Sequence, residues 1–335
     1  MKTSVGQVEI ATPRDRSGTF DPELVGKRER VLNDELDRKI LGLYGLGLSY
    51  ADISTHIREI YGVETNDAVI DAVTNTVIED LRAWQTRALE PVYPIVWMDA
   101  AFFKVKHQGA VNSRAVYTVL GVDEHGYKDV LGMYVAETEG ARHWLGVLSD
   151  LQQRGVKDIL MACTDNLKGF ADAIETIFPR TDVRGCIVHQ VRHTLRYVGY
   201  KDIPAVLADM KAIYKAKDEQ AALEALDALA EKWETATPKW WRVGATTGRA
   251  CPRSCATPNR SVAIYTTNII EGYHAQLRKV TKTKRVFDGD QAVLKLLYLV
   301  QQRIAKEKWQ KPLLNWRSIY LQLEILFKDR LTHFV

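Results

Sequence analysis

The stretch between residues 94 and 190 constrains the fold more than any other part of this sequence. It opens with three segments rich in β-branched and aromatic residues, PIVWMDAAFFKVK, SRAVYTVLGVD and KDVLGMYVAE. A helical segment, GARHWLGVLSDLQQRG, then precedes the strand KDILMACTD, the helix NLKGFADAIETIF and the short strand VRGCIVHQ, which runs into a further helix. Three strands followed by strand–helix units predict an α/β fold, a mixed sheet with helices on both faces.

Helices are predicted on either side of this block. LDRKILGLYGLGLS has apolar residues at helical spacing, and YADISTHIREIYG follows Ser49 as its N-cap and ends at Gly62. Thr65 or Asn66 is the expected cap of a third helix, DAVIDAVTNTVIEDLRAW. Residues 203–233 are rich in Ala, Leu, Lys and Glu, which favours helix, and helices return near residue 267.

The three N-terminal helices, joined by short turns, resemble a helix-turn-helix DNA-binding region. A purely structural three-helix unit is the alternative. Asp67 and Asp71 in the first turns of the third helix disfavour contact between that helix and phosphates. The better candidates for contact with a DNA backbone are Arg58, Arg82 and Arg87.

Charge is unevenly distributed along the chain. The net charge is +4, but residues 272–335 hold 13 Lys and Arg against 5 Asp and Glu. A basic region on a slightly acidic body fits either a contact with a polyanion or a solvated helix surface. No apolar run approaches the roughly 20 residues of a membrane span. The first residues lack a secretory pattern, and four cysteines suggest no disulfide framework, so we expect a cytoplasmic protein with no membrane partner.

Three carboxylates are candidate metal ligands. Asp99 lies in the middle of the apolar strand VWMDAAFFKVK, and Asp165 ends the strand KDILMACTD. If these strands are neighbours, both side chains reach one edge of the sheet, where Glu271 of TTNIIEGYHAQLRKVTK would complete an oxygen-only site suited to Mg²⁺. Taken singly, Asp165 also fits a helix cap and Glu271 a solvated helix residue. Asp123, which precedes a turn, is assigned to turn chemistry.

Several stretches, in the same order, carry a family resemblance. They are TPRDRSGTFDP, EPVYPIVWMDA, LGVDEHGYKDVLG, EGARHWLGVLSDLQQRGVKDILMACTDNLKGF, RGCIVHQVRH and IYTTNIIEGYHAQLRKVTKTK. From about Gly6 to the C-terminal region, the sequence resembles bacterial insertion-sequence transposases of the Mutator type, DDE transposases with an RNase H-like fold. The resemblance implies a mostly helical insertion between Asp165 and Glu271, which lie 106 positions apart.

The resemblance also implies a mechanism. Asp99, Asp165 and Glu271 would be the catalytic acids and would bind two Mg²⁺ ions, with Mn²⁺ as an alternative. Water would attack a phosphodiester at the end of the element, and the freed 3′-hydroxyl would then attack target DNA. The expected partners are the terminal inverted repeats, target DNA and further copies of the chain, at the nucleoid of a bacterial cell. The residues expected to grip backbone phosphates are Arg278, Lys279, Lys282, Lys284 and Arg285.

RGCIVHQVRH holds Cys186 and His189 at C-x2-H spacing, a signature of the family near its second aspartate. His189 is a candidate contact to the scissile DNA, and Arg192 is a candidate contact to its phosphates. A buried cysteine with a hydrogen-bonded histidine is the alternative. Cys251 and Cys255 would have to join this pair to complete a zinc site, which is disfavoured because the sequence around them is aberrant.

The aberrant window spans residues 239–261. It has no Leu, Ile or Phe, and no acidic residue occurs between Glu234 and Glu271. A backward shift of the reading frame by one base recovers the aromatic and Pro-Ile-Arg pattern of the family, so we hypothesise two compensating frameshifts around this window. The chain also begins inside the family pattern, and Gly272 and His274 stand where the family has Ser and Asn.

The expected organisation is sequential. It comprises an arm or linker at 1–34, the helix-turn-helix region at 35–90, the first part of an RNase H-like core at 91–200, a helical insertion at 201–263, and completion of the core with basic C-terminal helices at 264–335. Two functional alternatives stay open. One is an inactive remnant that only binds DNA, and the other is a nuclease or resolvase of the same fold that only hydrolyses.

Overall fold

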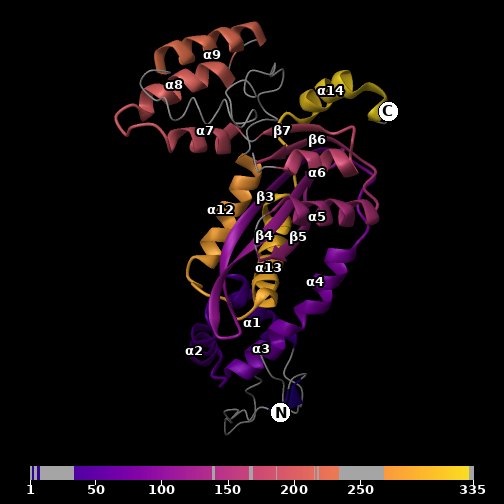
Figure 1. Cartoon of the computed structure of the whole chain (residues 1–335). Helices are drawn as coiled ribbons and strands as arrows, with labels where there is room; N and C mark the ends of the chain where they lie inside the picture. Colours follow the sequence, from indigo (N-terminus) through magenta and orange to yellow (C-terminus); the bar gives the residue numbers. More distant parts are fainter. Residues whose placement is uncertain are drawn as a thin grey trace. The chain divides into compact units, whose positions relative to one another are not determined.

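The structure is a computed structural model that describes residues 2–3, 6–7, 34–137, 140–165, 169–185, 187–214, 216, 219–233 and 268–331. Figure 1 traces its helices and strands along the chain. The chain divides into two compact units. The helical unit comprises Met1–Arg87, Phe102–Arg114 and His274–Glu307, and the sheet unit comprises Ala88–Ala101, Ala115–Tyr273 and Lys308–Val335. Each unit is therefore assembled from segments that are far apart in the sequence.

A five-stranded mixed sheet has the strand order β5-β4-β3-β6-β7. Its strands are β3 (Val92–His107), β4 (Ala110–Val122), β5 (Lys128–Ala136), β6 (Asp158–Thr164) and β7 (Asp182–Gly185). β4 and β5 pair antiparallel, whereas β6 pairs parallel with both β3 and β7. Numbered along the chain, the sheet reads third, second, first, fourth, fifth. This confirms the predicted RNase H-like arrangement.

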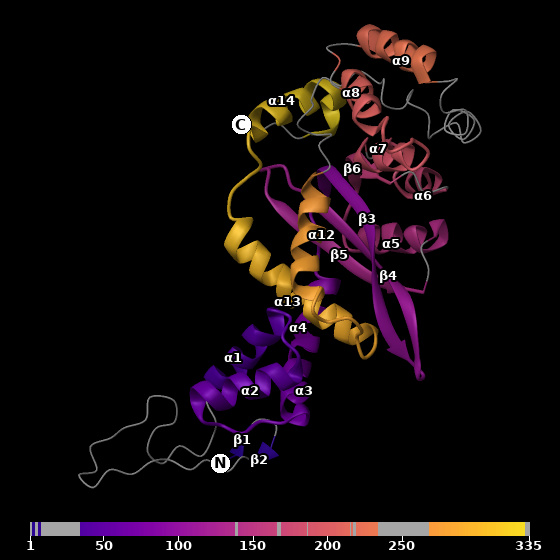
Figure 2. The ribbon, with the colours of Figure 1, turned by 90° about the vertical axis from the view of Figure 1, so that its left-hand side faces the viewer.

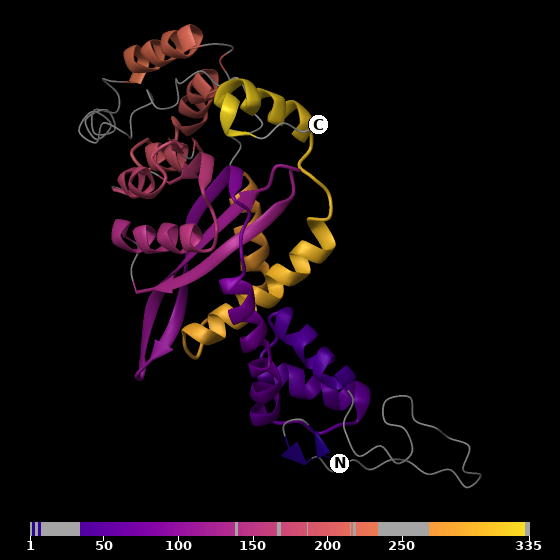
Figure 3. The same ribbon diagram turned by 90° about the vertical axis from the view of Figure 1, so that its right-hand side faces the viewer.

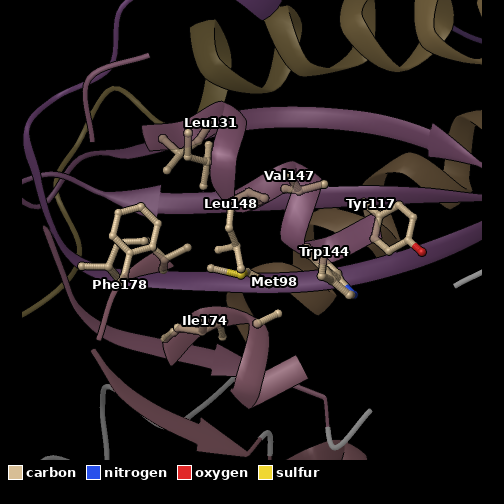
Figure 4. Packing of buried hydrophobic residues seen from close by; sticks show 14 of the residues in the cluster. Met98, Tyr117, Leu131, Trp144, Val147, Leu148, Ile174 and Phe178 are labelled. Carbon is tan, nitrogen blue, oxygen red and sulfur yellow. The ribbon is translucent and has the colours of Figure 1, made fainter. Parts of the chain in front are cut away.

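One face of the sheet is covered by α5 (Ala141–Gln153) and α6 (Phe170–Ile177). The ring of Trp144 stacks on Phe170 at 4.2 Å between centroids and meets Tyr117 of β4 edge-on at 4.7 Å. Figure 4 shows Met98 of β3 in the same cluster as Leu148 of α5. Burial contributes about 1.5–3 kcal/mol for each large apolar side chain, which holds β3 against these helices.

The hairpin between β4 and β5 closes with the predicted turn chemistry. The Asp123 carboxylate accepts a hydrogen bond from Tyr127 N at 2.8 Å, and Asp123 N donates to Tyr127 O at 3.0 Å. Gly126 has a φ of +88°, a conformation that favours glycine. Asp123 therefore has a structural role at this turn.

Four N-terminal helices replace the predicted three. They are α1 (Asp34–Gly45), α2 (Tyr50–Tyr61), α3 (Asp67–Asn75) and α4 (Val77–Thr86). The caps of α2 and α3 are as expected, with Ser49 in a capping box and Asn66 accepting from Val69 N. The expected single third helix was wrong, because it is divided at Thr76. The Thr76 hydroxyl donates to Val73 O at 2.7 Å, a local contact that competes with the helical hydrogen-bond ladder.

The helical unit is completed from the C-terminal part of the chain. The elements that contribute are α12 (Asn268–Thr281), from His274 on, and α13 (Asp290–Lys308), to Glu307. The Tyr44 hydroxyl donates to Ala292 O at 3.3 Å, and Trp84 packs on Tyr298 at 5.6 Å between ring centroids. A Cβ at Gly47 would lie 2.2 Å from the Val280 carbonyl oxygen, so this close approach requires glycine.

The predicted helical insertion is confirmed over α8 (Ile203–Tyr214) and α9 (Glu219–Trp233), which follow α7 (Ile187–Leu195). Apolar residues of the two helices share one core, and the Trp233 indole donates to the Asp209 carboxylate at 2.7 Å. The aberrant window at 239–261 lies outside the described residues, as do Cys251 and Cys255.

The C-terminal elements α14 (Trp316–Phe327) and η2 (Lys328–Arg330) belong to the sheet unit. The Trp316 indole donates to Glu124 O at 2.8 Å, and the Arg330 guanidinium makes two contacts with the Asp158 carboxylate, at 2.7 and 2.9 Å. This pairing joins the end of the described chain to the first residue of β6. In the described ranges, no helix has the length and apolar character needed to cross a membrane.

Candidate active site at the carboxyl edge of the sheet

Asp99 and Asp165 follow the last paired residues of two neighbouring parallel strands. The parallel pairing of β3 and β6 ends with Met98 opposite Thr164. Asp99 and Asp165 are the next residue of each chain, and both are half-buried. One Asp99 oxygen accepts a hydrogen bond from Ala100 N at 2.9 Å. The condition set by the sequence, that the two strands be neighbours, is therefore met.

Alternation along β3 places the Asp99 side chain on the face that α5 and α6 leave uncovered. Val96 and Met98 belong to the cluster under those helices, and successive side chains of a strand point to opposite faces. On β5, Tyr134 packs against that cluster, so Met133 faces the other way. The hydroxyl of Tyr273 on α12 contacts Met133 Sδ at 3.7 Å. α12 thus begins on the same face as Asp99, opposite α5 (Figure 2).

Glu271 reaches the same edge through its contact with α7. Its side chain is 19% exposed, and its Oε1 lies 3.0 Å from Nη1 of Arg192, in an ion pair whose angles do not make a hydrogen bond. α7 begins two residues after β7, whose last residue, Gly185, pairs with Thr164. Arg192 therefore links the third acid to the carboxyl edge that carries Asp165.

The chemistry of these donors fits a divalent metal ion, because carboxylate oxygens are the ligands that Mg²⁺ and Mn²⁺ prefer. Among the residues that the structure describes, however, no group of three or more His, Cys, Asp and Glu side chains is close enough to hold one ion. The fold brings Asp99 and Asp165 to neighbouring positions, while Glu271 is engaged with Arg192.

The other residues near the three acids have distinct surroundings. His189 is half-buried on α7, one turn before Arg192, whereas the placement of Cys186 lies outside the described residues. His274 is 3% exposed on α12, one turn after Glu271. A Cβ at Gly272 would meet no atom within 4 Å, so the serine expected there would also fit.

The predicted phosphate-binding cations differ in exposure. Arg278, Lys279, Lys282 and Arg285 are exposed. The Lys284 ammonium instead lies over the rings of Tyr44, Phe287 and Tyr50, at 4.9, 5.4 and 5.5 Å from their centroids. Burial lowers the pKa of Lys284. This position does not favour the phosphate contact predicted for Lys284.

The N-terminal arginines that were candidate DNA contacts also differ. Arg58 and Arg82 are exposed. Arg87 is half-buried, donates to Trp84 O at 2.8 Å and lies 4.8 Å from the centre of the Trp84 ring, so it terminates α4. Asp71 accepts a hydrogen bond from the Tyr50 hydroxyl at 3.0 Å, an intramolecular role that the sequence did not predict.

The fold and the site define a class of protein. An RNase H-like sheet with one aspartate on a central strand and a second directly after the neighbouring parallel strand is typical of enzymes that transfer nucleotidyl groups. Residues 1–312 match the family described as "Transposase, Mutator family". The chain belongs to the Mutator family of transposases.

Relatives cover most of the chain. A "Transposase for insertion sequence element ISRM3" from Rhizobium meliloti (strain 1021) is 39% identical over 98% of this chain and 82% of its own length. A "Probable transposase for insertion sequence element" from Corynebacterium diphtheriae is 33% identical over 96% of this chain and 100% of its own length. The family resemblance predicted from the sequence is thereby confirmed.

Solved structures resemble the chain more distantly. The "Drosophila P element transposase strand transfer complex" covers 91% of this chain and 88% of its own, with 10% identity and a TM-score of 0.35. The "Crystal structure of the catalytic domain of Mos1 mariner transposase" covers 56% of this chain and 97% of its own, with 17% identity and a TM-score of 0.18. Scores this low carry no residue correspondences.

Proposed function

We propose that this transposase cleaves and joins phosphodiesters at the ends of an insertion sequence, with Asp99, Asp165 and Glu271 as its catalytic acids. The register of β3 and β6 supports this proposal, because their pairing ends with Met98 opposite Thr164, and Asp99 and Asp165 are the residues that follow. Two divalent ions, when bound there, would activate the attacking oxygen and stabilise the leaving one.

The residues of this chain have separate tasks in that reaction. Asp99 and Asp165 supply the paired carboxylate oxygens. Glu271 joins them when it leaves Arg192, and the released guanidinium then faces the DNA phosphate that approaches the edge. Exchange of one anionic partner for another costs little at Arg192, since its side chain is 61% exposed and the ion pair is not a hydrogen bond. His189, one turn earlier, would contact the scissile DNA.

DNA is the proposed partner, and the chain would act as a homo-oligomer on paired ends. Arg278, Lys279, Lys282 and Arg285 are exposed cations that would hold backbone phosphates. Such contacts release counterions, so binding weakens as salt rises. Light scattering on the chain with and without a duplex of the terminal repeat measures the number of copies.

A nicking assay tests the catalytic acids. The substrate is a duplex that carries the terminal inverted repeat found beside the gene, with Mg²⁺ or Mn²⁺. Asp165→Asn should lower the nicking rate by more than about 100-fold, since loss of an outer-shell partner of a metal ligand already costs about 10–100-fold. Asp123→Asn is the matched control, because it keeps the acceptor that Tyr127 N needs, and should cleave like the parent. Equal cleavage by Asp165→Asn would refute the site.

The nicking assay and a strand-transfer assay with pre-cleaved ends distinguish the proposed transposase from an inactive remnant and from a nuclease. Salt-sensitive DNA binding without metal-dependent cleavage would identify an inactive remnant, which the aberrant sequence at 239–261 favours. Cleavage without joining of pre-cleaved ends to target DNA would identify a nuclease. A peptide mass map across this window decides the frameshift hypothesis.

A further inference from the structure

The strand that carries Asp99 continues into a basic hairpin. β3 and β4 are joined by Gln108 and Gly109, both with positive φ, at 49° and 82°. Such a two-residue turn matches the twist of a hairpin. The hairpin, residues 102–114, belongs to the helical unit.

Side chains alternate sharply along the β3 arm of this hairpin. Phe103 is 8% exposed and Val105 is fully buried. Lys104 and Lys106, between and beyond them, are exposed. The two lysines therefore stand on one face of the strand and point to solvent, while the opposite face is packed.

The segment between α12 and α13 pairs with this arm. Lys106 N donates to Phe287 O at 2.8 Å, and Phe287 N donates to Lys104 O at 2.9 Å. The Phe287 ring packs edge-on against Phe103 at 6.0 Å between centroids. Figure 3 shows this orange segment beside the hairpin. The pairing holds the segment that carries Arg285, two residues before Phe287, against the strand that carries Lys104 and Lys106.

The surface that results carries six exposed cations, with the exposed Asp288 directly after Phe287. Its exposed cations are Lys104, Lys106, Arg278, Lys279, Lys282 and Arg285. Neither stretch, 102–107 nor 278–287, contains an acidic residue. Farther on, Asp290 lies 3.4 Å from the buried Arg114, which partly neutralises it. Clustered cations on an ordered surface attract a polyanion.

We propose that the hairpin face of Lys104 and Lys106, together with Lys282 and Arg285 of the segment that pairs with the hairpin, binds the phosphate backbone of duplex DNA. The inference rests on the proposed function and extends it, since it assigns DNA contact to the same strand that carries Asp99. The contacts are to phosphates and carry no base specificity, so any duplex sequence is bound.

Salt-dependent binding tests this surface in the full chain. Fluorescence anisotropy with a 30-base-pair duplex of arbitrary sequence gives log Kd against log salt concentration. The double variant Lys104→Ala/Lys106→Ala should bind more weakly, with a slope less steep by about two, because each lysine that contacts a phosphate contributes about one. The matched control Lys157→Ala/Lys211→Ala removes two exposed lysines elsewhere and should keep the parent slope.

Hydrogen exchange gives a second readout on the parent chain. The duplex should slow exchange in peptides that cover 102–114 and 278–288. A parent that binds duplex DNA with a slope unaffected by the double variant, or without protection of these peptides, would overturn the inference and leave the proposed function standing. A parent that binds no DNA would refute the proposed function itself. If these peptides are protected from exchange at high protein concentration in the absence of DNA, the surface mediates self-association. That result would also overturn the inference.

Discussion

Asp99 is a half-buried carboxylate that directly follows the almost fully buried residues Val96, Trp97 and Met98 of β3. The register of the sheet explains why a carboxylate is tolerated there. Pairing with β6 stops one residue earlier, and Asp165 takes the adjacent position. The sequence was sufficient to name both residues and to predict that they reach one edge if their strands are neighbours, because parallel strands bring their carboxyl ends to one edge. The sequence was insufficient to predict the ion pair of Arg192 with Glu271, since Arg192 was predicted only as a contact to DNA phosphates. No sequence pattern marks an ion pair between residues so far apart.

Replacement of Arg192 should strengthen metal binding. If Glu271 is a metal ligand, as proposed, Arg192→Ala removes a cation that would compete with the metal for it. The affinity for Mn²⁺ should then rise roughly two- to fivefold, the range set by an exposed ion pair of about 0.5–1 kcal/mol. Mn²⁺ titration followed by electron paramagnetic resonance measures this without any DNA or turnover.

Arg196→Ala is the control for that titration. Arg196 is also exposed and lies about one turn beyond Arg192, just past the end of α7. Its loss should leave the Mn²⁺ affinity unchanged. If Arg192→Ala binds Mn²⁺ no better than Arg196→Ala does, then Arg192 does not compete with the metal for Glu271.

At the scale of single elements, α13 is tied to α3 by a buried lysine. Lys295 Nζ lies 2.7 Å from Asn75 Oδ1, 3.3 Å from Thr74 Oγ1 and 3.6 Å from Asp71 Oδ1. Its side chain is 5% exposed, and burial lowers its pKa. The free-energy cost of desolvating the Lys295 ammonium therefore offsets much of the stabilisation that these contacts contribute to the folded state.

Two substitutions at Lys295 separate packing from charge. Lys295→Met keeps the apolar stem, and Asp71 and Asn75 are exposed enough to be rehydrated, so the free energy of unfolding should change by less than about 1 kcal/mol. Lys295→Ala also removes the stem and should cost about 2–3 kcal/mol. Urea unfolding measures both. A methionine variant as unstable as the alanine variant would show that the polar network stabilises the contact.

Secondary structure was predicted well where a periodic pattern was strong. The alternation in FFKVK matches the observed exposure of Lys104 and Lys106, although the sequence predicted no role for these lysines. The break at Thr76 was missed, because the apolar spacing continues through it. A hydroxyl that bonds a nearby carbonyl has no signature in the hydrophobic pattern.

At the scale of the whole molecule, the compact units do not follow chain order. The helical unit combines the N-terminal helices with α12 from His274 on and α13 to Glu307. The five sequential segments expected from the sequence stay a prediction of domain organisation.

The N-terminal helices should therefore not fold alone. A fragment of residues 34–90 lacks the partners of Tyr44 and Trp84 on α13, and its circular dichroism should show no cooperative thermal transition. The same fragment linked to residues 274–307 through a flexible spacer should regain one. A sharp transition in the isolated fragment would mean that the helix-turn-helix region is an independent domain.

The sequence by itself determined the family and the RNase H-like fold class, because motifs and hydrophobic periods are local properties of a chain, and it predicted Asp99, Asp165 and Glu271 as the catalytic acids. The tertiary structure decided three further matters: the pairing of Glu271 with Arg192, the inward position of Lys284 and the union of the hairpin with the segment around Phe287. Each of these contacts depends on which surfaces meet when distant segments of the chain pack together. Because many different sequences satisfy the same packing, local sequence patterns do not specify such contacts.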